Sequence, residues 1–231
     1  MEFFKFLLRK FLNIPITIYF NFSTLPFKQA IKLPILVSYK TKIEQIRKGM
    51  IYIEGTISRA MIQIGIGGTN GVVAERKNYI RIGLSNAAKI IFKGSAIFSE
   101  GALISVDRGV LVLGKNFFAN KNFYISCNKR IEVGDDVIIG YYVKMFDSDN
   151  HTIISPQGLK AGMKDIKIGN HVWIAAQVDI LKGSFVGDNS IIAYRSLVCK
   201  HFTESNVLIG GAPANIIEHN INWDDNFSYD L

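Results

Sequence analysis

An aliphatic residue returns at every sixth position between residues 168 and 198 of this chain. The series is Ile168, Ile174, Ile180, Val186, Ile192 and Val198. Neither an α-helix nor a β-hairpin keeps a period of six residues, whereas the short flat strands and tight corners of a parallel β-helix do. An ordinary β-sandwich with fortuitous spacing is the alternative. The pattern therefore predicts an all-β, three-sided solenoid with the aliphatic side chains inside.

A second phase of the repeat supports this interpretation. The residues four places after each aliphatic are all small or β-branched, which suits strands packed inside a narrow prism. They are Val172, Val178, Ser184, Ser190 and Ser196. The same step occurs upstream at Ile91, Ile97 and Leu103, at Leu113, Ala119 and Ile125, and at Val133, Ile139 and Met145. We therefore expect the solenoid to occupy residues 49–217, after an extension at 1–48 and before a mobile tail at 218–231.

The repeat is lost in residues 147–165, which are polar and include Pro156 and Gly158. Insertions in a solenoid become loops on its outside, and such loops often build the working surface. We therefore predict a protruding loop here.

Composition narrows the choice of partners. The chain has 27 Lys and Arg against 19 Asp and Glu, a formal charge of +8, which favours an anionic partner such as an acidic lipid, an acidic glycan or a phosphate-rich cofactor. Basic runs interleaved with aromatic residues are absent, so we predict no nucleic-acid binding. Cys127 and Cys199 form no CxxC pair, which fits a reducing, cytoplasmic compartment. Cys199 follows an inward aliphatic and is interpreted as packing.

The first 27 residues are both apolar and basic. Lys5, Arg9 and Lys10 interrupt the apolar residues, which argues against a cleaved secretory signal. The uncharged span 11–27 contains two prolines and is short for a bilayer crossing. Apolar residues at helical spacing predict a short amphipathic helix followed by extended chain over 13–40; they are Phe3, Phe4, Leu7, Leu8 and Phe11. This helix would either lie on an anionic membrane surface or cap the open end of the solenoid.

His151 is the main candidate for chemistry, because it lies near the start of the protruding loop. An imidazole with a pKa near its usual value of about 6.5 can accept a proton from a hydroxyl at neutral pH. Asp147 and Asp149 are close enough in sequence to orient the ring. The alternative is a merely exposed or structural histidine. No two histidines stand at zinc-ligand spacing, so we predict no metal site.

Five blocks together resemble the hexapeptide-repeat acyltransferases, above all the maltose and galactoside O-acetyltransferases and the capsule and lipopolysaccharide O-acetyltransferases. They are VGDDVIIG at Val133, DSDNH at Asp147, IGNHVWIAAQVDILKG at Ile168, VGDNSIIAYRS at Val186 and GGAPANII at Gly210. The resemblance covers about residues 111–217. It implies a left-handed parallel β-helix, a homotrimer, and acetyl transfer from acetyl-CoA to a sugar hydroxyl in a cleft between subunits.

The resemblance also implies roles for individual residues. His151 would be the general base, and Asn120 in the ANKN stretch would hold the acetyl carbonyl or the acceptor. Acetyl-CoA would meet Trp173, the backbone of Ala175, Ala176, Ala193 and Tyr194, and the cations Arg195 and Lys200. Arg195 would replace a charge, because Asn215 stands where the family often has an arginine. We expect Phe118, Tyr142, Asp147 and Asp149 to meet the saccharide.

Blander interpretations stay open for several of these residues. Asn120 would suit a left-handed corner, Trp173 would cover a corner, and Lys200 would be a solvated surface residue. Two other functions also remain at this point. One is sugar-nucleotide N-acetyl transfer with the same base, and the other is a non-catalytic scaffold. The acceptor is predicted to be a bacterial surface polysaccharide or its precursor, reached through peripheral contact at the inner membrane face.

Overall fold

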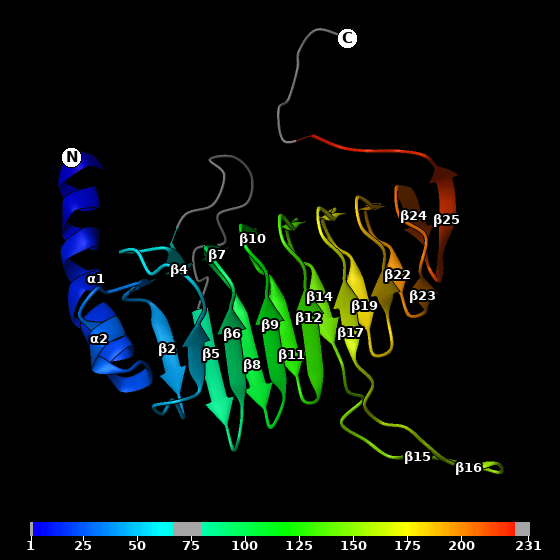
Figure 1. The fold of residues 1–231 in the computed structure, drawn as a ribbon, viewed down its shortest axis with the longest axis horizontal. Coiled ribbons are helices and arrows are strands. Elements are labelled where there is room, and N and C mark those ends of the chain that lie inside the picture. Colours follow the sequence, from blue (N-terminus) through cyan, green and yellow to red (C-terminus); the bar gives the residue numbers. More distant parts are fainter. Residues whose placement is uncertain (1, 67–79, 225–231) are drawn as a thin grey trace, which may run out of the picture.

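The computed structural model of the chain describes residues 2–66 and 80–224, with side chains described from Phe11 onward. Three parallel sheets form the sides of a rod, and the chain visits sheets A, B and C in turn (Figure 1). Sheet A contains β1 (Ile35–Val37), β4 (Ile62–Ile64), β7 (Ala96–Phe98), β10 (Phe117–Ala119), β13 (Ile138–Ile139), β18 (Trp173–Ile174), β21 (Ile191–Ile192), β24 (Val207–Gly211) and β25 (Ala214–His219).

Sheets B and C follow the same stepping. Sheet B contains β2 (Thr41–Glu44), β5 (Ile80–Ser85), β8 (Leu103–Asp107), β11 (Tyr124–Cys127), β14 (Lys144–Phe146), β19 (Asp179–Leu181) and β22 (Leu197–Val198). Sheet C contains β3 (Ile51–Ile53), β6 (Lys89–Phe92), β9 (Val110–Leu113), β12 (Arg130–Val133), β17 (Ile166–Ile168), β20 (Phe185–Val186) and β23 (His201–Phe202). The predicted left-handed parallel β-helix is confirmed.

The six-residue series between 168 and 198 forms the core of the later coils. Ile139, Ile174, Ile192 and Ile209 pair in register along sheet A, and each is fully buried. The serines of the second phase are also buried. The Ser184 hydroxyl lies 2.6 Å from the Leu181 carbonyl and 3.0 Å from the Val198 carbonyl, so burial leaves its polar atom bonded.

In the earlier coils the predicted phase is displaced by one residue. Ile91, Ile97 and Leu103 lie half-buried on the outside, whereas their neighbours Ile90 and Ile104 point into the core. A shift of one residue exchanges the two faces of a strand. These strands carry apolar residues on both faces, so alternation alone did not distinguish inside from outside.

The amino-terminal region differs from the prediction. Helix α1 (Glu2–Thr24) runs through Pro15 and is followed by α2 (Phe27–Ala30), so the expected extended chain is wrong for residues 13–24. The helix packs on the first coil, with Phe20 and Leu25 buried, and it caps that end of the rod. Strands β1 and β2 already pair within the sheets before residue 49. Within the described residues, neither helix is long and apolar enough to cross a membrane.

The insertion at 147–165 leaves the rod between β14 and β17 and carries an antiparallel hairpin, β15 (Ile153–Ser155) and β16 (Gly158–Lys160) (Figure 1). We call these residues the arm. At the far end, β25 pairs antiparallel with β24. Residues 221–224 then fold back on the rod, where Ile221 N donates to Asn206 O at 2.9 Å. The predicted mobility of the tail is therefore wrong for its first residues, and 225–231 lie outside the described residues.

Candidate functional site

Two columns of corners border sheet B. The AB corner consists of residues 120–122, 140–142, 175–177 and 193–195 on successive coils. The BC corner consists of residues 128–129, the arm, residues 182–184 and residues 199–200. Asn120 and the predicted donor-binding residues Ala175, Ala176, Ala193, Tyr194 and Arg195 lie at the AB corner, whereas His151 and Lys200 lie at the BC corner.

An open groove of about 600 Å³ runs along the AB corner and the adjoining face of sheet B. Its lining residues are Tyr142, Lys144, Gln177, Asp179, Arg195, Ser196, Leu197 and Ala212. Tyr142 and Arg195 were predicted as saccharide and donor contacts. Gln177 was missed, although it stands three places after an inward aliphatic, as Tyr142 and Arg195 do. All three turn the chain with a positive φ of 57–60°.

The backbone of the AB corner is partly used by the fold. Ala175 N donates to Ile192 O at 2.9 Å, and Ala193 N donates to Ile209 O at 2.8 Å. These two N–H groups are already bonded within the fold, so Ala175 and Ala193 could bond a pantetheine chain only through their carbonyl groups. The corners stack closely, since a Cβ at Gly140 would lie 2.7 Å from Ala176 N. Tyr194 is 57% exposed beside them.

Asn120 begins the AB corner and is only 7% exposed. Its Oδ1 accepts a hydrogen bond from Lys121 N at 2.9 Å, and its own N donates to Ile139 O. The positive φ of this turn falls on Asn122, at 60°, rather than on Asn120. A left-handed backbone therefore does not explain the asparagine at position 120.

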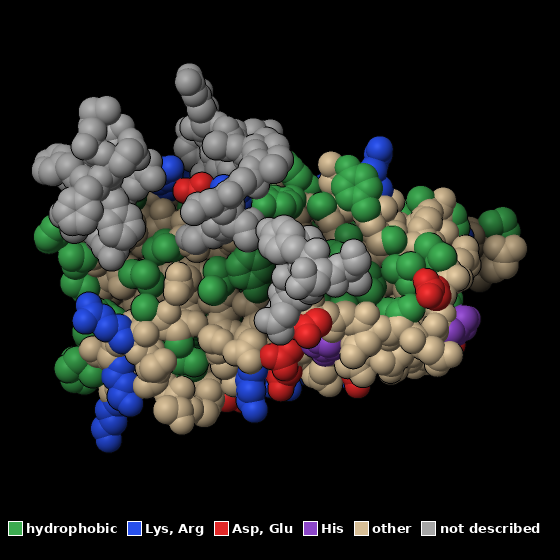
Figure 2. Space-filling model, turned by 90° about the horizontal axis from the view of Figure 1, so that it is seen from above, with side chains coloured by type: hydrophobic (Ala, Val, Ile, Leu, Met, Phe, Trp, Pro, Cys, Tyr) green, Lys and Arg blue, Asp and Glu red, His purple; other side chains and the backbone are tan. Residues whose placement is uncertain are grey.

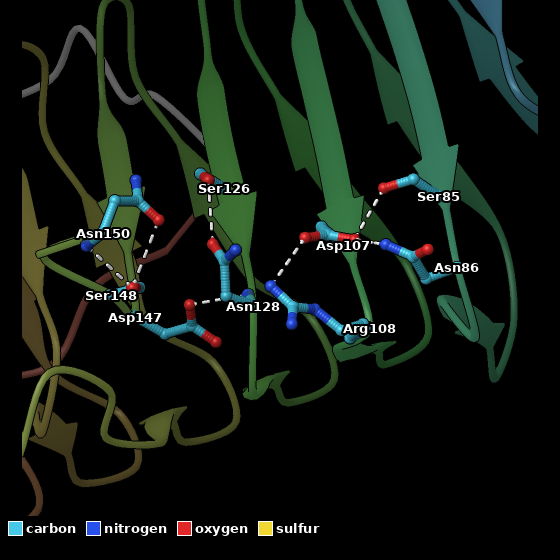
Figure 3. A network of polar contacts seen from close by, with 9 residues as sticks. All are labelled: Ser85, Asn86, Asp107, Arg108, Ser126, Asn128, Asp147, Ser148 and Asn150. Atoms are coloured by element: carbon cyan, nitrogen blue, oxygen red, sulfur yellow. Dashed lines mark hydrogen bonds and ion pairs between the residues drawn. The ribbon is translucent and has the colours of Figure 1, made fainter.

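At the BC corner, Asp147 anchors the arm from below the surface. Its carboxylate is fully buried and accepts a hydrogen bond from Asn128 N at 2.7 Å (Figure 3). It accepts a second one from Lys129 N at 2.8 Å. Both oxygens thus bond the preceding coil. The predictions that Asp147 orients the imidazole or meets the saccharide are wrong for this geometry, because a buried carboxylate satisfied in this way faces neither.

Further contacts fix the base of the arm. Asp149 pairs with Lys182 at 2.6 Å, and Lys182 Nζ also donates to Ala161 O at 2.7 Å. Asp149 N donates to Gly162 O at 2.9 Å, which ties the two sides of the arm together. His151 lies two residues after Asp149 and is exposed. The arm therefore presents its imidazole to solvent from a backbone that is held in place.

The two cysteines have opposite environments at this corner. Burial and the neighbouring Asp147 carboxylate raise the pKa of the Cys127 thiol far above its usual range. Cys199 is exposed, so its predicted packing role is wrong. Both are free. Since the Cys127 thiol stays protonated and buried, it is not a nucleophile for this site.

The predicted aromatic residues do not gather in one place. Trp173 lies on the outer face of sheet A and is 41% exposed, rather than covering a corner. Phe118 lines a separate hollow of about 320 Å³ with His171 and Trp223. Trp223 stacks on His171 at 4.2 Å and donates from Nε1 to His171 O at 2.9 Å. This stack was missed, because its partners lie far apart in the chain.

Lys200 is exposed at the BC corner. Its Nζ lies 2.6 Å from Asn215 Oδ1 and 5.4 Å from the centre of the Phe202 ring. An exposed ammonium with this one hydrogen bond can still bind a phosphate group. Among the described residues, no three His, Cys, Asp or Glu side chains gather in an arrangement that could hold a metal ion.

A strand of sheet B separates the two columns. At about 3.3 Å per residue, the four residues of β11 alone span roughly 13 Å. Asn120 and His151 thus lie on different corners of one prism.

No family model matches the chain. It is 35% identical over 107 residues to the galactoside O-acetyltransferase of Escherichia coli K12, covering 46% of this chain and 52% of that protein. It is 31% identical over 136 residues to the polysialic acid O-acetyltransferase of Escherichia coli O1:K1, covering 58% of this chain and 43% of that one. The chain thus spans about half the length of these curated relatives.

Among solved structures, the polysialic acid O-acetyltransferase OatWY superposes with a TM-score of 0.56 at 20% identity, covering 85% of this chain and 90% of that one. This likeness shows the shared fold. Together with the sequence similarities, it confirms the predicted resemblance: in sequence and in fold, this chain is similar to the hexapeptide-repeat acyltransferases, and its relatives include galactoside and polysialic acid O-acetyltransferases.

Proposed function

We propose that the chain is an O-acetyltransferase that moves acetyl from acetyl-CoA to a sugar hydroxyl of a bacterial surface polysaccharide or its precursor. The groove along the AB corner carries this proposal, because it runs beside the stacked small residues predicted for the donor and is lined by Tyr142 and Arg195. The similarity to galactoside and polysialic acid O-acetyltransferases supports the reaction and the class of acceptor.

In this proposal acetyl-CoA lies along the AB corner, with Trp173 beside its arm and Arg195 near its phosphates. Lys200, which lies at the BC corner, would reach the phosphates from the neighbouring subunit. The amides of Ala176 and Tyr194 replace those of Ala175 and Ala193 as candidate donors to the pantetheine. Asn120 meets the acetyl carbonyl. The thioester carbon would then face the arm of a neighbouring subunit, which brings His151 to the acceptor hydroxyl.

The proposed chemistry is direct transfer. The His151 imidazole removes the proton of the sugar hydroxyl while the oxygen attacks the thioester carbon. The tetrahedral oxyanion collapses, the C–S bond breaks, and the imidazolium returns the proton to the thiolate. Orientation of donor and acceptor can supply up to roughly 7 to 11 kcal/mol in favourable cases. A hydrogen bond from Asn120 to the oxyanion would add about 3 kcal/mol.

We also propose that the working unit is a homotrimer in the cytoplasm, acting at the inner face of the membrane. A closed ring of heterologous contacts would place the AB corner of each chain against the BC corner of the next. The two free cysteines support a reducing compartment.

The test is a thiol-release assay with acetyl-CoA and a panel of saccharides. We expect release that depends on a hydroxyl-bearing glycan, together with a mass gain of one acetyl group on that glycan. Amino-sugar nucleotides in the same panel distinguish O-transfer from N-transfer. Acetylation of the amine alone would replace this proposal with N-transfer, and the absence of release with every acceptor would favour a scaffold.

A further inference from the structure

The inner face of helix α1 carries polar side chains beside the apolar Ile16 and Phe20. Asn13, Thr17 and Asn21 recur one turn apart and bond the backbone of β1 and the residues after it. Asn13 Oδ1 accepts from Tyr39 N at 2.8 Å, and Thr17 Oγ1 accepts from Val37 N at 3.0 Å. Asn21 bonds both Ile35 N, at 3.1 Å, and Ile35 O, at 2.6 Å. The helix side chains thus satisfy a strand edge that would otherwise be open.

The opposite face of the helix is consequently apolar and faces outward. From Phe11 onward, the exposed side chains of α1 are Phe11, Leu12, Ile14, Pro15, Ile18, Tyr19 and Phe22; Phe27 in α2 and Ile31 directly after it are exposed as well. Phe27 and Ile31 are 65% and 61% exposed, and the rings of Phe22 and Phe27 lie 5.9 Å apart. We call these residues the outer apolar face. Figure 1 shows that the helix stands at the free end of the rod, away from the arm.

The chain segment that carries this face has charges of one sign. No acidic residue occurs between Glu2 and Glu44, whereas Lys28, Lys32 and Lys40 are exposed next to or near α2. The sequence adds Lys5, Arg9 and Lys10 in the first turns, whose side chains lie outside the described residues. Glu54 lines a hollow with Pro26 and Gln29 beside α2, but the segment that carries the face itself has only cations. Such a face suits an anionic surface. A second copy of the same face would bring like charges together.

We propose that the outer apolar face docks on an anionic lipid bilayer. The apolar side chains would enter the boundary between headgroups and acyl chains, to a depth of about 5–10 Å, while the lysines meet the headgroups. The polar face would stay on β1, so the helix caps the solenoid and contacts lipid at the same time. This inference does not depend on the proposed acyl transfer.

Vesicle flotation tests the proposal with the full chain. We expect binding to phosphatidylcholine vesicles that contain phosphatidylglycerol, and at least tenfold weaker binding to phosphatidylcholine alone. The double variant Ile14→Gln/Ile18→Gln should weaken binding to the anionic vesicles more than tenfold, because it removes two apolar anchors. Ile217→Gln is the matched control, since Ile217 is 61% exposed at the opposite end of the rod, and it should bind as the parent does.

A second variant separates charge from folding. Lys28→Gln/Lys32→Gln leaves the helix contacts with β1 intact and should weaken binding to anionic vesicles roughly tenfold, with no change on neutral vesicles. Failure of the unaltered chain to float with anionic vesicles would overturn the proposal, as would equal losses in Ile217→Gln. A drop in oligomer mass for Ile14→Gln/Ile18→Gln, measured by sedimentation equilibrium, without vesicle binding by the parent would assign the face to contacts between copies instead.

Discussion

At the AB corner, successive coils turn within three residues, each at a positive φ, and small side chains let one corner lie directly on the next. At the BC corner, the arm interrupts the same repeat. Buried or paired carboxylates, instead of closely stacked small residues, connect the neighbouring coils there. Asp147 bonds two amides of the coil before it, and Asp149 pairs with Lys182 on the coil after it. The AB corner therefore forms a continuous groove along the coils. The BC corner presents the His151 side chain from an arm whose base is held in place.

This difference suits a division of roles in the proposed reaction, with donor binding at the AB corner and proton transfer at the arm. A long donor needs an uninterrupted groove, such as the one that Gln177 and Arg195 line. A general base needs a defined position with access to solvent and acceptor, which the arm provides for His151. Seen from above in Figure 2, hydrophobic side chains recur along the rod from end to end.

The largest effect on activity is expected from His151 in the arm. His151→Ala should lower kcat about a thousandfold and leave the KM for acetyl-CoA nearly unchanged, because the base acts on the acceptor. Steady-state thiol release measures both constants. His219→Ala, an exposed histidine on β25, is the matched control and should behave as the parent does. Retention of most turnover in His151→Ala would remove this residue from the base role.

The next effect concerns the AB corner. Asn120→Ala should lower kcat about a hundredfold if its amide stabilises the oxyanion. Asn120→Asp keeps the hydrogen-bond acceptor for Lys121 N but places a negative charge beside the oxyanion. Its kcat should therefore be no higher than that of Asn120→Ala. Both variants should keep the melting temperature within a few degrees of the parent. Activity in Asn120→Asp close to that of the parent would contradict an oxyanion contact.

The buried carboxylate is expected to act on stability rather than on chemistry. Asp147→Ala should lower the free energy of unfolding by about 2 kcal/mol or more, because it leaves the Asn128 and Lys129 amides without partners. Asp149→Ala removes a partly exposed ion pair and should cost less than about 1 kcal/mol. Urea unfolding compares the two. Equal losses would show that Asp147 is not the anchor of the arm.

The smallest effect is expected from the exposed cation of the groove. Arg195→Ala should raise the KM for acetyl-CoA severalfold with little change in kcat, because an exposed arginine contributes modestly to phosphate binding. Arg108→Ala, which removes another exposed arginine away from the groove, is the control. An unchanged KM for Arg195→Ala would mean that it does not replace the arginine that the family often has at the position of Asn215.

The sequence predicted those parts of the fold that repeat along the chain. In the coils between Ile168 and Val198, the aliphatic residue at every sixth position is buried, as the six-residue step predicts. Upstream, strands that are apolar on both faces, such as the one containing Ile90 and Ile91, left their phase ambiguous. Pro15 suggested an early end to the first helix. The hydrogen bonds from Asn13, Thr17 and Asn21 to the first strand and the residues after it join residues far apart in the chain. No local sequence pattern predicts them.

The candidate site was predictable in outline for the same reason. Tyr142 and Arg195 hold equivalent places in the repeat, and Gln177 could have been found from that spacing. Asp147 could not be assigned correctly, because its partners Asn128 and Lys129 reach it only when one coil lies on another. The stack of Trp223 on His171 likewise joins residues 52 positions apart.

We propose that the AB corner of one chain and the arm of its neighbour form one site. Mixing His151→Ala with Asn120→Ala subunits, after dissociation and reassembly, tests it most directly. Each variant alone should be nearly inactive. Since each site would take Asn120 from one chain and His151 from the next, random mixing should restore about a quarter of the parent's thiol release. Activity of the mixture no greater than the average of the two variants would contradict a site shared between chains.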